Sequence, residues 1–387
     1  MDAVRATVIR NGELLTPEPA GRTDLLVIGD RIAALGGFDA ILLERGGLEV
    51  DVVEADGACV VPGFIDPHAH LLGGSGEGGF AKQTPELWPS EVLPAGITTI
   101  VGTLGVDTTM KTPAGLLAKV KAFNEDGLSA FMWTGGYDVP PTPITASVRT
   151  DILFITEVIG VGELAIADER ASDPELPELA RIAHEAHAGG LLSGKAGVTH
   201  FHVGGGKRRL RCLHELLDAE RLQVDPAWLY PTHVQRSEAL LDEAIALVRR
   251  GATVDFDVAD EDLERWLPRY LERGGDPERL TISSDASKTA PRLLHEQVAH
   301  VVREGIADLS TVLPMITSNT ARVLGLSTKG VLAPGADADI TILDSGSFDV
   351  VHVLAGGRQL VRDGELTIRE HAMDESNRRL ELHGVEG

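Results

Sequence analysis

Six side chains with metal-binding chemistry occur within or at the ends of apolar segments of the sequence. They are His68, His70, Glu163, His202, His233 and Asp285. In a strand, residues i and i+2 point to the same side, so His68 and His70 can bind one ion together. Imidazole and carboxylate ligands suit zinc, and manganese, cobalt and nickel also accept them. The set as a whole predicts a metal site, although a single histidine pair or strand-end histidine is more often structural.

The carboxylates in this set favour two ions rather than one. Glu163 has two oxygens and could bridge two ions, with His202 and His233 holding the second. Asp285 completes the set and can also accept a proton. Two ions roughly 3.5–4 Å apart polarise a carbonyl and generate hydroxide from water near neutral pH. We therefore predict a centre with two Zn²⁺. The alternative is that Glu163 pairs with a nearby arginine and the site holds a single metal.

Eight apolar segments would have to position these side chains. They are residues 60–71, 98–104, 130–137, 159–167, 200–203, 229–234, 252–258 and 280–285. Helical patterns such as residues 113–124 and 237–249 lie between them. Strands that alternate with helices pair in parallel, and eight such units predict an α/β fold of the (β/α)8 TIM barrel type. The active site of such a barrel forms at the carboxyl ends of its strands.

The two ends of the chain differ in their residue pattern from this central part. Residues 1–58 and 329–387 contain short strand patterns and turns such as Asn11-Gly12. We expect these two pieces to pack together as a small, discontinuous β-sandwich domain. The barrel would then occupy residues 59–328.

Composition limits the partners and the compartment. The formal net charge is −24, which disfavours nucleic acid as a partner. The two cysteines, Cys59 and Cys212, form no CxxC pair and fit a reducing compartment. No apolar run has the length of a signal peptide or a membrane span. We expect a soluble, cytoplasmic protein with no membrane partner.

Several segments resemble a known family. PGFIDPHAH, at Pro62–His70, resembles the first-strand signature of the amidohydrolase superfamily. GKAGVTHFHVG (194–204), YPTHVQRS (230–237) and TISSDASK (281–288) resemble later strands of bacterial isoaspartyl (β-aspartyl) dipeptidases. GVLAPGADADITIL (330–343) matches the return into the small β domain. The resemblance covers almost the whole chain.

The resemblance implies zinc-dependent hydrolysis of β-aspartyl dipeptides by a metal-bridging hydroxide. Asp285 would transfer the proton, and Tyr137 would hydrogen-bond the developing oxyanion. It also implies a small dipeptide as the partner in binding, and a homo-oligomer.

Four further residues match positions that bind the substrate in this family. Glu77, on a glycine-rich loop, matches the residue that binds the substrate ammonium. Arg170 and Arg236 match the residues that bind carboxylates, for which a planar guanidinium is suited. Ser287 lies near a family serine that contacts a substrate carboxylate.

Two positions depart from the family. Val106 stands where the family has a substrate-contacting threonine. Glu163 stands where the family has a carboxylated lysine that bridges the metals, and one extra residue, at Gly162, precedes it. An extra residue makes a bulge that re-aims a side chain, which would compensate for the shorter glutamate. Lys195 is not a substitute for the missing lysine, because the family has a lysine there as well.

Other interpretations remain open. The chain could be another amidohydrolase, such as an N-acyl-amino-acid deacylase or a cyclic-amide hydrolase, although Glu77 disfavours both because neither substrate offers an ammonium. It could also be a non-catalytic scaffold. Among the remaining polar residues, we expect His200 to pack outside the barrel and Lys288 to lie at the rim. His184, His187 and His214 fall on helical patterns and are expected to be solvated.

Overall fold

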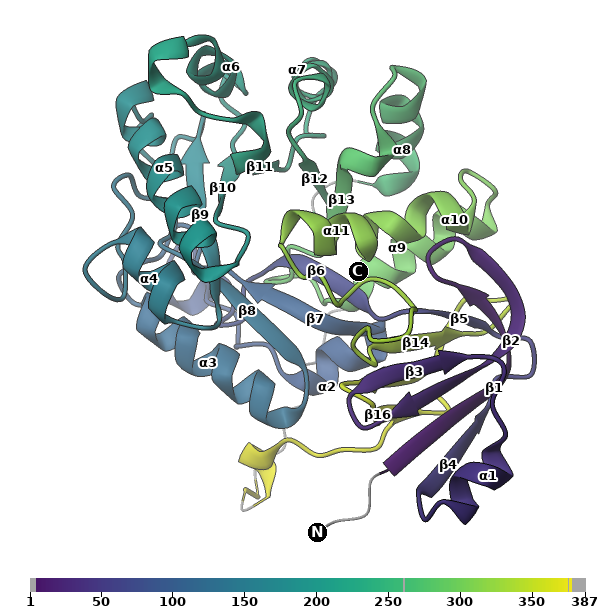
Figure 1. The fold of residues 1–387 in the computed structure, drawn as a ribbon. Helices are drawn as coiled ribbons and strands as arrows, with labels where there is room; N and C mark the ends of the chain where they lie inside the picture. The colour runs from purple at the N-terminus through teal and green to yellow at the C-terminus, as the bar shows by residue number, and fades with distance from the viewer. Residues whose placement is uncertain (1–4, 260–261, 375, 378–387) are drawn as a thin grey trace.

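The computed structural model describes residues 5–259, 262–374 and 376–377, and shows a barrel beside a smaller sheet (Figure 1). Each of the eight predicted barrel segments contains a strand. These are β6 (Phe64–Ala69), β7 (Ile97–Gly102), β8 (Ser129–Thr134), β9 (Val158–Ile166), β10 (Val198–Val203), β11 (Leu229–Thr232), β12 (Val254–Asp257) and β13 (Leu280–Ser283). Strands β6 to β11 pair in parallel in chain order, and β12 pairs with β13. A bridge between Ala69 and Ala286 brings the end of β13 to β6 and closes the barrel.

Helices cover the outside of the barrel. The longer ones are α3 (Pro113–Asp126), α4 (Val148–Phe154), α5 (Leu176–Ser193), α6 (Arg211–Asp218), α7 (Glu238–Arg249), α8 (Leu263–Glu272) and α9 (Arg292–Arg303). The shorter ones are α2 (Pro89–Val92), α10 (Leu309–Val312) and α11 (Ser318–Val323), whereas α1 (Ala40–Arg45) packs beside the small sheet instead (Figure 1). Helix α7 begins where the Ser237 side chain accepts a hydrogen bond from the Leu240 amide. It buries Leu241, Ala244 and Val248, whose spacing of three and four places them on one face.

Both chain ends contribute to the small sheet. Its strands are β1 (Arg5–Leu15), β2 (Pro19–Ile28), β3 (Arg31–Leu35), β4 (Glu49–Glu54), β5 (Cys59–Pro62), β14 (Ile340–Leu343), β15 (Val350–Ala355), β16 (Arg358–Arg362) and β17 (Glu365–Leu366). Strand β14 pairs antiparallel with β5 and so joins the two ends of the chain. Apolar residues of β1, β2, β14 and β15, including Leu14, Leu25, Ile340 and Leu354, meet in one core.

The segment 60–71, predicted as one barrel strand, is in fact two strands. Residues 59–62 form β5 in the small sheet, and the barrel strand β6 begins only at Phe64. The break falls at Gly63, where a β-carbon would lie 2.3 Å from the Thr98 hydroxyl oxygen. Only glycine allows the chain to pass so close to β7 at the point where it leaves the small sheet for the barrel.

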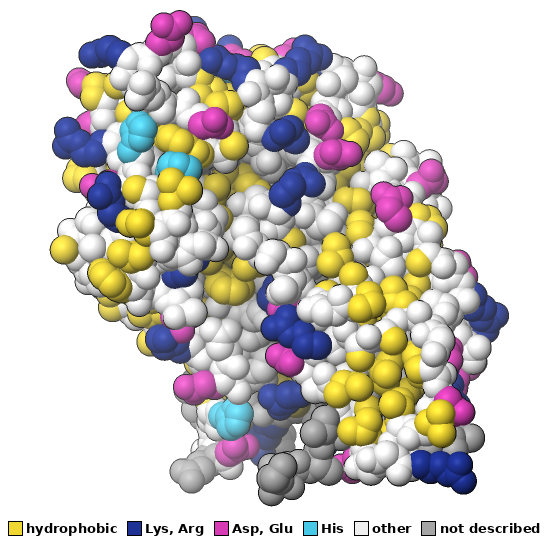
Figure 2. All heavy atoms as spheres, viewed as in Figure 1, with side chains coloured by type: hydrophobic (Ala, Val, Ile, Leu, Met, Phe, Trp, Pro, Cys, Tyr) yellow, Lys and Arg dark blue, Asp and Glu magenta, His cyan; other side chains and the backbone are white. Residues whose placement is uncertain are grey.

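The surface carries mixed charge. On the face in Figure 2, lysine and arginine side chains are scattered among acidic ones, and apolar side chains gather over the small sheet. Within the described part of the chain, no helix has both the length and the apolar character needed to cross a membrane.

Candidate active site

A cavity of about 350 Å³ opens at the carboxyl ends of the barrel strands. Ten of the eleven residues predicted for the site line it: His70, Glu77, Tyr137, Glu163, Arg170, His202, His233, Arg236, Asp285 and Ser287. His68, the eleventh, is fully buried beneath it, within 3.5 Å of Glu163 and Asp285. Val106 and Lys288 also line the cavity. The fold therefore brings together residues that are more than 200 positions apart in the sequence.

The six proposed metal ligands converge at the floor of this cavity. His68 Nε2 lies 3.5 Å from Glu163 Oε2 and 3.3 Å from Asp285 Oδ1. His70 Nε2 lies 3.1 Å from the same oxygen of Asp285, and His233 Nε2 lies 3.5 Å from Glu163 Oε1. Ligand atoms from these residues form three overlapping groups, within each of which all atoms lie within 4.8 Å of one another.

These atoms fit metal ions because several of them are buried and otherwise unused. His68 Nε2, Glu163 Oε2 and Asp285 Oδ1 make no hydrogen bond to any residue that the structure describes. Leaving such groups buried and unsatisfied costs free energy. A cation among nitrogen and oxygen ligands would satisfy all three, and this donor chemistry suits a divalent transition metal.

Glu163 reaches the cluster through an irregularity in β9. Thr199 of β10 pairs with Val161, but Phe201 pairs with Leu164, so β9 carries one extra residue, as the insertion at Gly162 predicts. Gly162 has a φ of 149°, and a β-carbon there would lie 2.5 Å from the His200 carbonyl oxygen. Glycine is therefore needed for this backbone to approach β10.

Two other candidate ligands have an unusual backbone conformation. His233 has a φ of 61° and Asp285 a φ of 45°, both in the left-handed region that residues with a β-carbon seldom adopt. His233 directly follows β11, and Asp285 lies two residues after the end of β13. Such conformations persist where the surroundings impose them, and they cluster at functional sites.

The charges of the cluster stabilise one another. Burial would raise the pKa of Glu163, but His68, His202 and His233 outweigh it and hold that pKa well below its usual value. Burial would lower the pKa of His68, but Glu163 and Asp285 raise it to about 9. The pKa of Asp285 is likewise held well below normal, against burial, by the imidazoles of His68 and His70, whose Nε2 atoms lie 3.3 and 3.1 Å from its Oδ1. Both carboxylates are therefore ionised at neutral pH.

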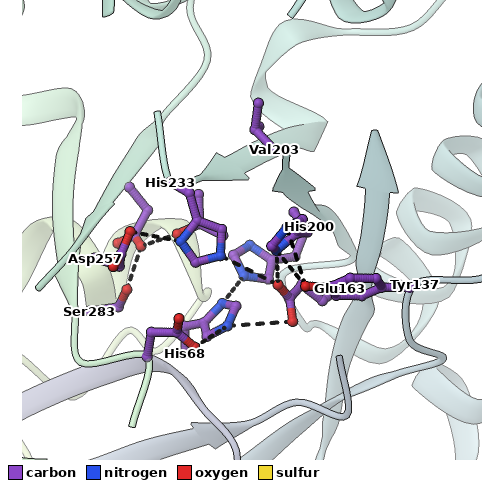
Figure 3. Close-up of polar contacts among 12 residues, drawn as sticks. His68, Tyr137, Glu163, His200, Val203, His233, Asp257 and Ser283 are labelled. Atoms are coloured by element: carbon purple, nitrogen blue, oxygen red, sulfur yellow. Dashed lines mark hydrogen bonds and ion pairs between the residues drawn. The ribbon is translucent and has the colours of Figure 1, made fainter. Parts of the chain in front are cut away.

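Two carboxylates behind the ligands were missed in the sequence. Asp257 Oδ2 accepts a hydrogen bond of 2.7 Å from His233 Nδ1 (Figure 3). Asp168 Oδ2 lies 3.0 Å from His202 Nε2. Carboxylates in this position orient metal-binding histidines and fix which ring nitrogen carries the proton. Asp257 ends strand β12, so the strand-end rule applied to the other strands would have found it. Asp168 lies in a loop, where no such rule applies.

The prediction that His200 packs outside the barrel is wrong. Its ring is fully buried, and its Nε2 lies 2.7 Å from His68 Nδ1 (Figure 3). His200 and His202 are two residues apart in β10, so they point to the same side, as His68 and His70 were expected to do. The rule that placed the first pair should have placed the second.

The surface histidines were also misjudged. His187 stacks on Trp228 with 4.0 Å between ring centroids, and His184 Nε2 bonds the Leu222 carbonyl at 2.8 Å. His214 bonds the Glu243 carbonyl. All three are half-buried rather than solvated, because they fill the space between neighbouring helices and loops. Lys195 bonds three backbone carbonyls, those of Ile152, Ile155 and Val158, and does not line the cavity.

An ion pair lies at the cavity wall above the cluster. Arg170 Nη1 donates to Glu77 Oε1 at 2.8 Å, and its other nitrogens bond both oxygens of Asp168. The Arg170 guanidinium also lies 5.1 Å from the centre of the Tyr137 ring. Arg236 donates to the Val203 carbonyl at 2.7 Å. Burial and the charge of Glu163 raise the pKa of Tyr137 well above 10, so its phenol keeps a proton to donate.

A model of the amidohydrolase family matches residues 59–360, and the chain belongs to that family. It is an enzyme, a hydrolase that acts on carbon–nitrogen bonds. A solved structure of a β-aspartyl dipeptidase from the thermophilic, keratin-degrading Fervidobacterium islandicum AW-1 superposes with a TM-score of 0.88. It is 36% identical, over 95% of this chain and 100% of that one. A structure of the same dipeptidase in complex with β-Asp-Leu gives a TM-score of 0.87 at 35% identity, over 95% of this chain and 99% of that one.

Curated relatives are named for a different activity. An adenine deaminase of Geobacillus kaustophilus (strain HTA426) is 24% identical over 98% of this chain, and one of Ruegeria pomeroyi (strain ATCC 700808 / DSM 15171 / DSS-3) is 26% identical over 93%. The chain spans only 61% and 58% of these two proteins. The solved structures and the curated relatives thus carry different activities.

Proposed function

We propose that this enzyme hydrolyses β-aspartyl dipeptides. The observation that carries the proposal is the ion pair between Glu77 and Arg170 at the cavity wall. The aspartyl unit of such a dipeptide carries an ammonium and a carboxylate on the same carbon. Its ammonium would bind Glu77 and its carboxylate Arg170, so that the substrate replaces one ion pair with two. Charge-assisted hydrogen bonds of this kind are strong and directional.

The metal cluster supports hydrolysis at the adjacent amide. His68, His70, His202, His233, Glu163 and Asp285 would hold two divalent ions, which we propose to be zinc. Two such ions supply an electrophile for the amide carbonyl and a water of lowered pKa. Glu163 would bridge them, since one of its oxygens faces His68 and the other faces His202.

The remaining steps use side chains around the cavity. The Tyr137 phenol would donate a hydrogen bond to the carbonyl oxygen as negative charge develops there. Asp285, ionised in the free enzyme, would take a proton from the attacking water and pass it to the leaving amine. Arg236 and Ser287, which follow β11 and β13 respectively, would bind the remaining carboxylate and hold the peptide in register.

Competing substrates use the cavity less well. An adenine ring is uncharged near neutral pH and offers neither an ammonium for Glu77 nor a carboxylate for Arg170. An N-acyl amino acid has no ammonium for Glu77. Likeness to the dipeptidase structures covers nearly all of both chains, whereas the deaminases contain a large part that this chain does not match.

A panel of four compounds tests the proposal. Purified enzyme is assayed with β-Asp-Leu, α-Asp-Leu, N-acetyl-β-Asp-Leu and adenine under the same conditions. We expect β-Asp-Leu to be cleaved fastest. Loss of one charge-assisted hydrogen bond costs about 1.5–3 kcal/mol, and Glu77 is partly solvated. The N-acetyl compound should therefore react roughly 10- to 100-fold more slowly.

The variant Glu77→Gln provides the matched control. It removes the charge of the side chain but keeps its shape. The variant should therefore cleave β-Asp-Leu more slowly, and the difference in rate between β-Asp-Leu and its N-acetyl form should become smaller. Equal rates on the acetylated and free dipeptides in the native enzyme would favour a deacylase instead. Turnover of adenine without any dipeptide cleavage would show that this enzyme has the deaminase activity for which the curated relatives are named.

We further propose that the enzyme works in the cytoplasm and as a homo-oligomer. The first rests on two cysteines that form no disulfide in the described residues, and the second on the family resemblance. Size-exclusion chromatography with light scattering measures the second directly.

A further inference from the structure

We propose that His200 is a positioning residue that fixes the proton of His68 on Nδ1 and keeps its Nε2 available to a metal ion. The role rests on the metal centre proposed above. It concerns a residue that binds no substrate and contributes no ligand atom to the groups described for the cluster.

The direction of the hydrogen bonds follows from their last acceptor. His200 Nδ1 lies 2.9 Å from the Tyr230 carbonyl oxygen, and a carbonyl can only accept. His200 Nδ1 therefore carries the proton, and in a neutral ring Nε2 is then the acceptor. His68 Nδ1, 2.7 Å away, must donate to it. When the His68 ring is neutral, as it must be to bind an ion, its lone pair is therefore on Nε2.

That lone pair points where the ion is needed. His68 Nε2 is buried without a hydrogen bond in the described structure, 3.5 Å from Glu163 Oε2 and 3.3 Å from Asp285 Oδ1. Without an acceptor at Nδ1, the proton of a neutral His68 ring could sit on either nitrogen. On Nε2 it would block the ion. Setting the tautomer of a ligand in advance raises metal affinity.

The surroundings hold the His200 ring in this orientation. Trp133 stacks on the His200 ring, with 4.9 Å between ring centroids and 21° between the ring planes. The centroid of the Tyr230 ring also lies 4.9 Å from that of His200. Trp133 is itself fixed, because its indole nitrogen donates to the Pro67 carbonyl at 3.1 Å. His200 thus cannot turn without displacing two buried aromatic rings.

The same residue packs against the irregularity that carries Glu163. A β-carbon on Gly162 would lie 2.5 Å from the His200 carbonyl oxygen and 2.7 Å from its β-carbon. The extra residue of β9 and the imidazole of β10 therefore occupy one packed unit. One side of that unit presents Glu163 to the cluster, and the other side fixes His68.

Two variants of nearly equal size separate hydrogen bonding from packing. His200→Gln keeps a donor for the Tyr230 carbonyl and an acceptor for His68, whereas His200→Met fills similar space with neither. His295→Met is the control, since His295 is also buried and bonds one carbonyl, that of Phe348, outside the cavity.

Zinc affinity is measured for each protein by competition with a chromophoric chelator, and unfolding is followed after metal removal. We expect His200→Met to bind one zinc about 10- to 100-fold more weakly, with His200→Gln close to the native protein and His295→Met unchanged. The visible spectrum of the cobalt-substituted protein should change in His200→Met and be kept in His200→Gln.

Other results would overturn the role. Unchanged zinc affinity in a folded His200→Met would show that His200 contributes packing but not the hydrogen bond to His68. Equal weakening of zinc affinity in both His200 variants would show that the imidazole ring itself is required, and not its hydrogen bonds alone. Native protein that binds no zinc at all would overturn the metal centre itself. If His200→Met does not fold, nitrogen-15 shifts of the zinc-bound native protein decide. The shifts should show the His200 proton on Nδ1 alone, and protons on both of its nitrogens would refute the role.

Discussion

Replacement of Glu163 by glutamine is the sharpest perturbation of the cluster. The change removes one negative charge and keeps the size and one oxygen of the side chain. Glu163 is 1% exposed, and its carboxylate contacts histidines from three other strands. Water cannot replace the missing charge at such a buried position. The change should therefore directly weaken the binding of any cation held there.

The magnitude follows from the distances. Glu163 Oε2 lies 3.5 Å from His68 Nε2, and Oε1 lies 3.5 Å from His233 Nε2. Two unit charges about 4 Å apart attract by about 4 kcal/mol at an effective dielectric constant near 20. Since 1.4 kcal/mol is about a factor of ten, Glu163→Gln should bind at least one zinc roughly 1,000-fold more weakly.

The assay starts from protein stripped with a chelator. Native protein and Glu163→Gln are reloaded with zinc, with and without bicarbonate, and bound metal, zinc affinity and β-Asp-Leu cleavage are measured. The native protein should recover both metal and activity without bicarbonate, because a glutamate needs no carbon dioxide to become a bridge. Glu163→Gln should recover little of either.

Asp255→Asn is the matched control. Asp255 is a fully buried carboxylate of the same barrel, but it accepts hydrogen bonds from the hydroxyls of Thr232 and Ser283 and belongs to no metal-binding group described. Its zinc affinity should stay native even if stability falls. A Glu163→Gln protein with two tightly bound zinc ions, or a native protein whose recovery depends steeply on bicarbonate, would show that another group is the bridge.

Three further outcomes are expected. Asp257→Asn weakens the acceptor of the 2.7 Å bond from His233 and should lower zinc affinity about 10- to 100-fold; unchanged affinity would mean that this bond does not orient the ligand. Arg236→Lys should reduce kcat/KM for β-Asp-Leu by about 10- to 100-fold, because an ammonium cannot reproduce the guanidinium fork, and native kinetics would remove Arg236 from the substrate site. In metal-free protein the pKa of His68 is raised to about 9 by facing carboxylates despite burial, and that of His233 to about 10 by Asp257 despite burial and Arg236. The stability these protonated rings contribute is complete below pH about 6.5 and is lost as the pH rises through 9 to 10. The melting temperature of stripped protein should fall across that window and that of zinc-loaded protein much less, and parallel curves would contradict the assignment of both rings as ligands.

The barrel could be predicted because its signals are local. Apolar strands alternating with helical patterns specify parallel strands, and each of the eight predicted segments holds one. The break at Gly63 was missed because it depends on the Thr98 side chain of the neighbouring strand. No pattern within residues 60–71 records that contact.

The sequence alone was enough to select the inner set of candidate ligands. The two-residue period of a strand pairs His68 with His70, and the parallel arrangement brings the other strand ends to the same mouth. The insertion before Glu163 likewise predicted the shift in pairing between β9 and β10. These features need only the order of residues along each strand.

Only the tertiary structure decided which residues hydrogen-bond to those candidate ligands and which residues lie next to them in the cavity. Asp168, Asp257 and His200 acquire their partners through the register of neighbouring strands and the course of loops. Glu77 and Arg170 are 93 residues apart, and no local pattern shows that they meet. Their contact depends on how two loops fold over one cavity, because side chains far apart in the chain interact only after the barrel has closed.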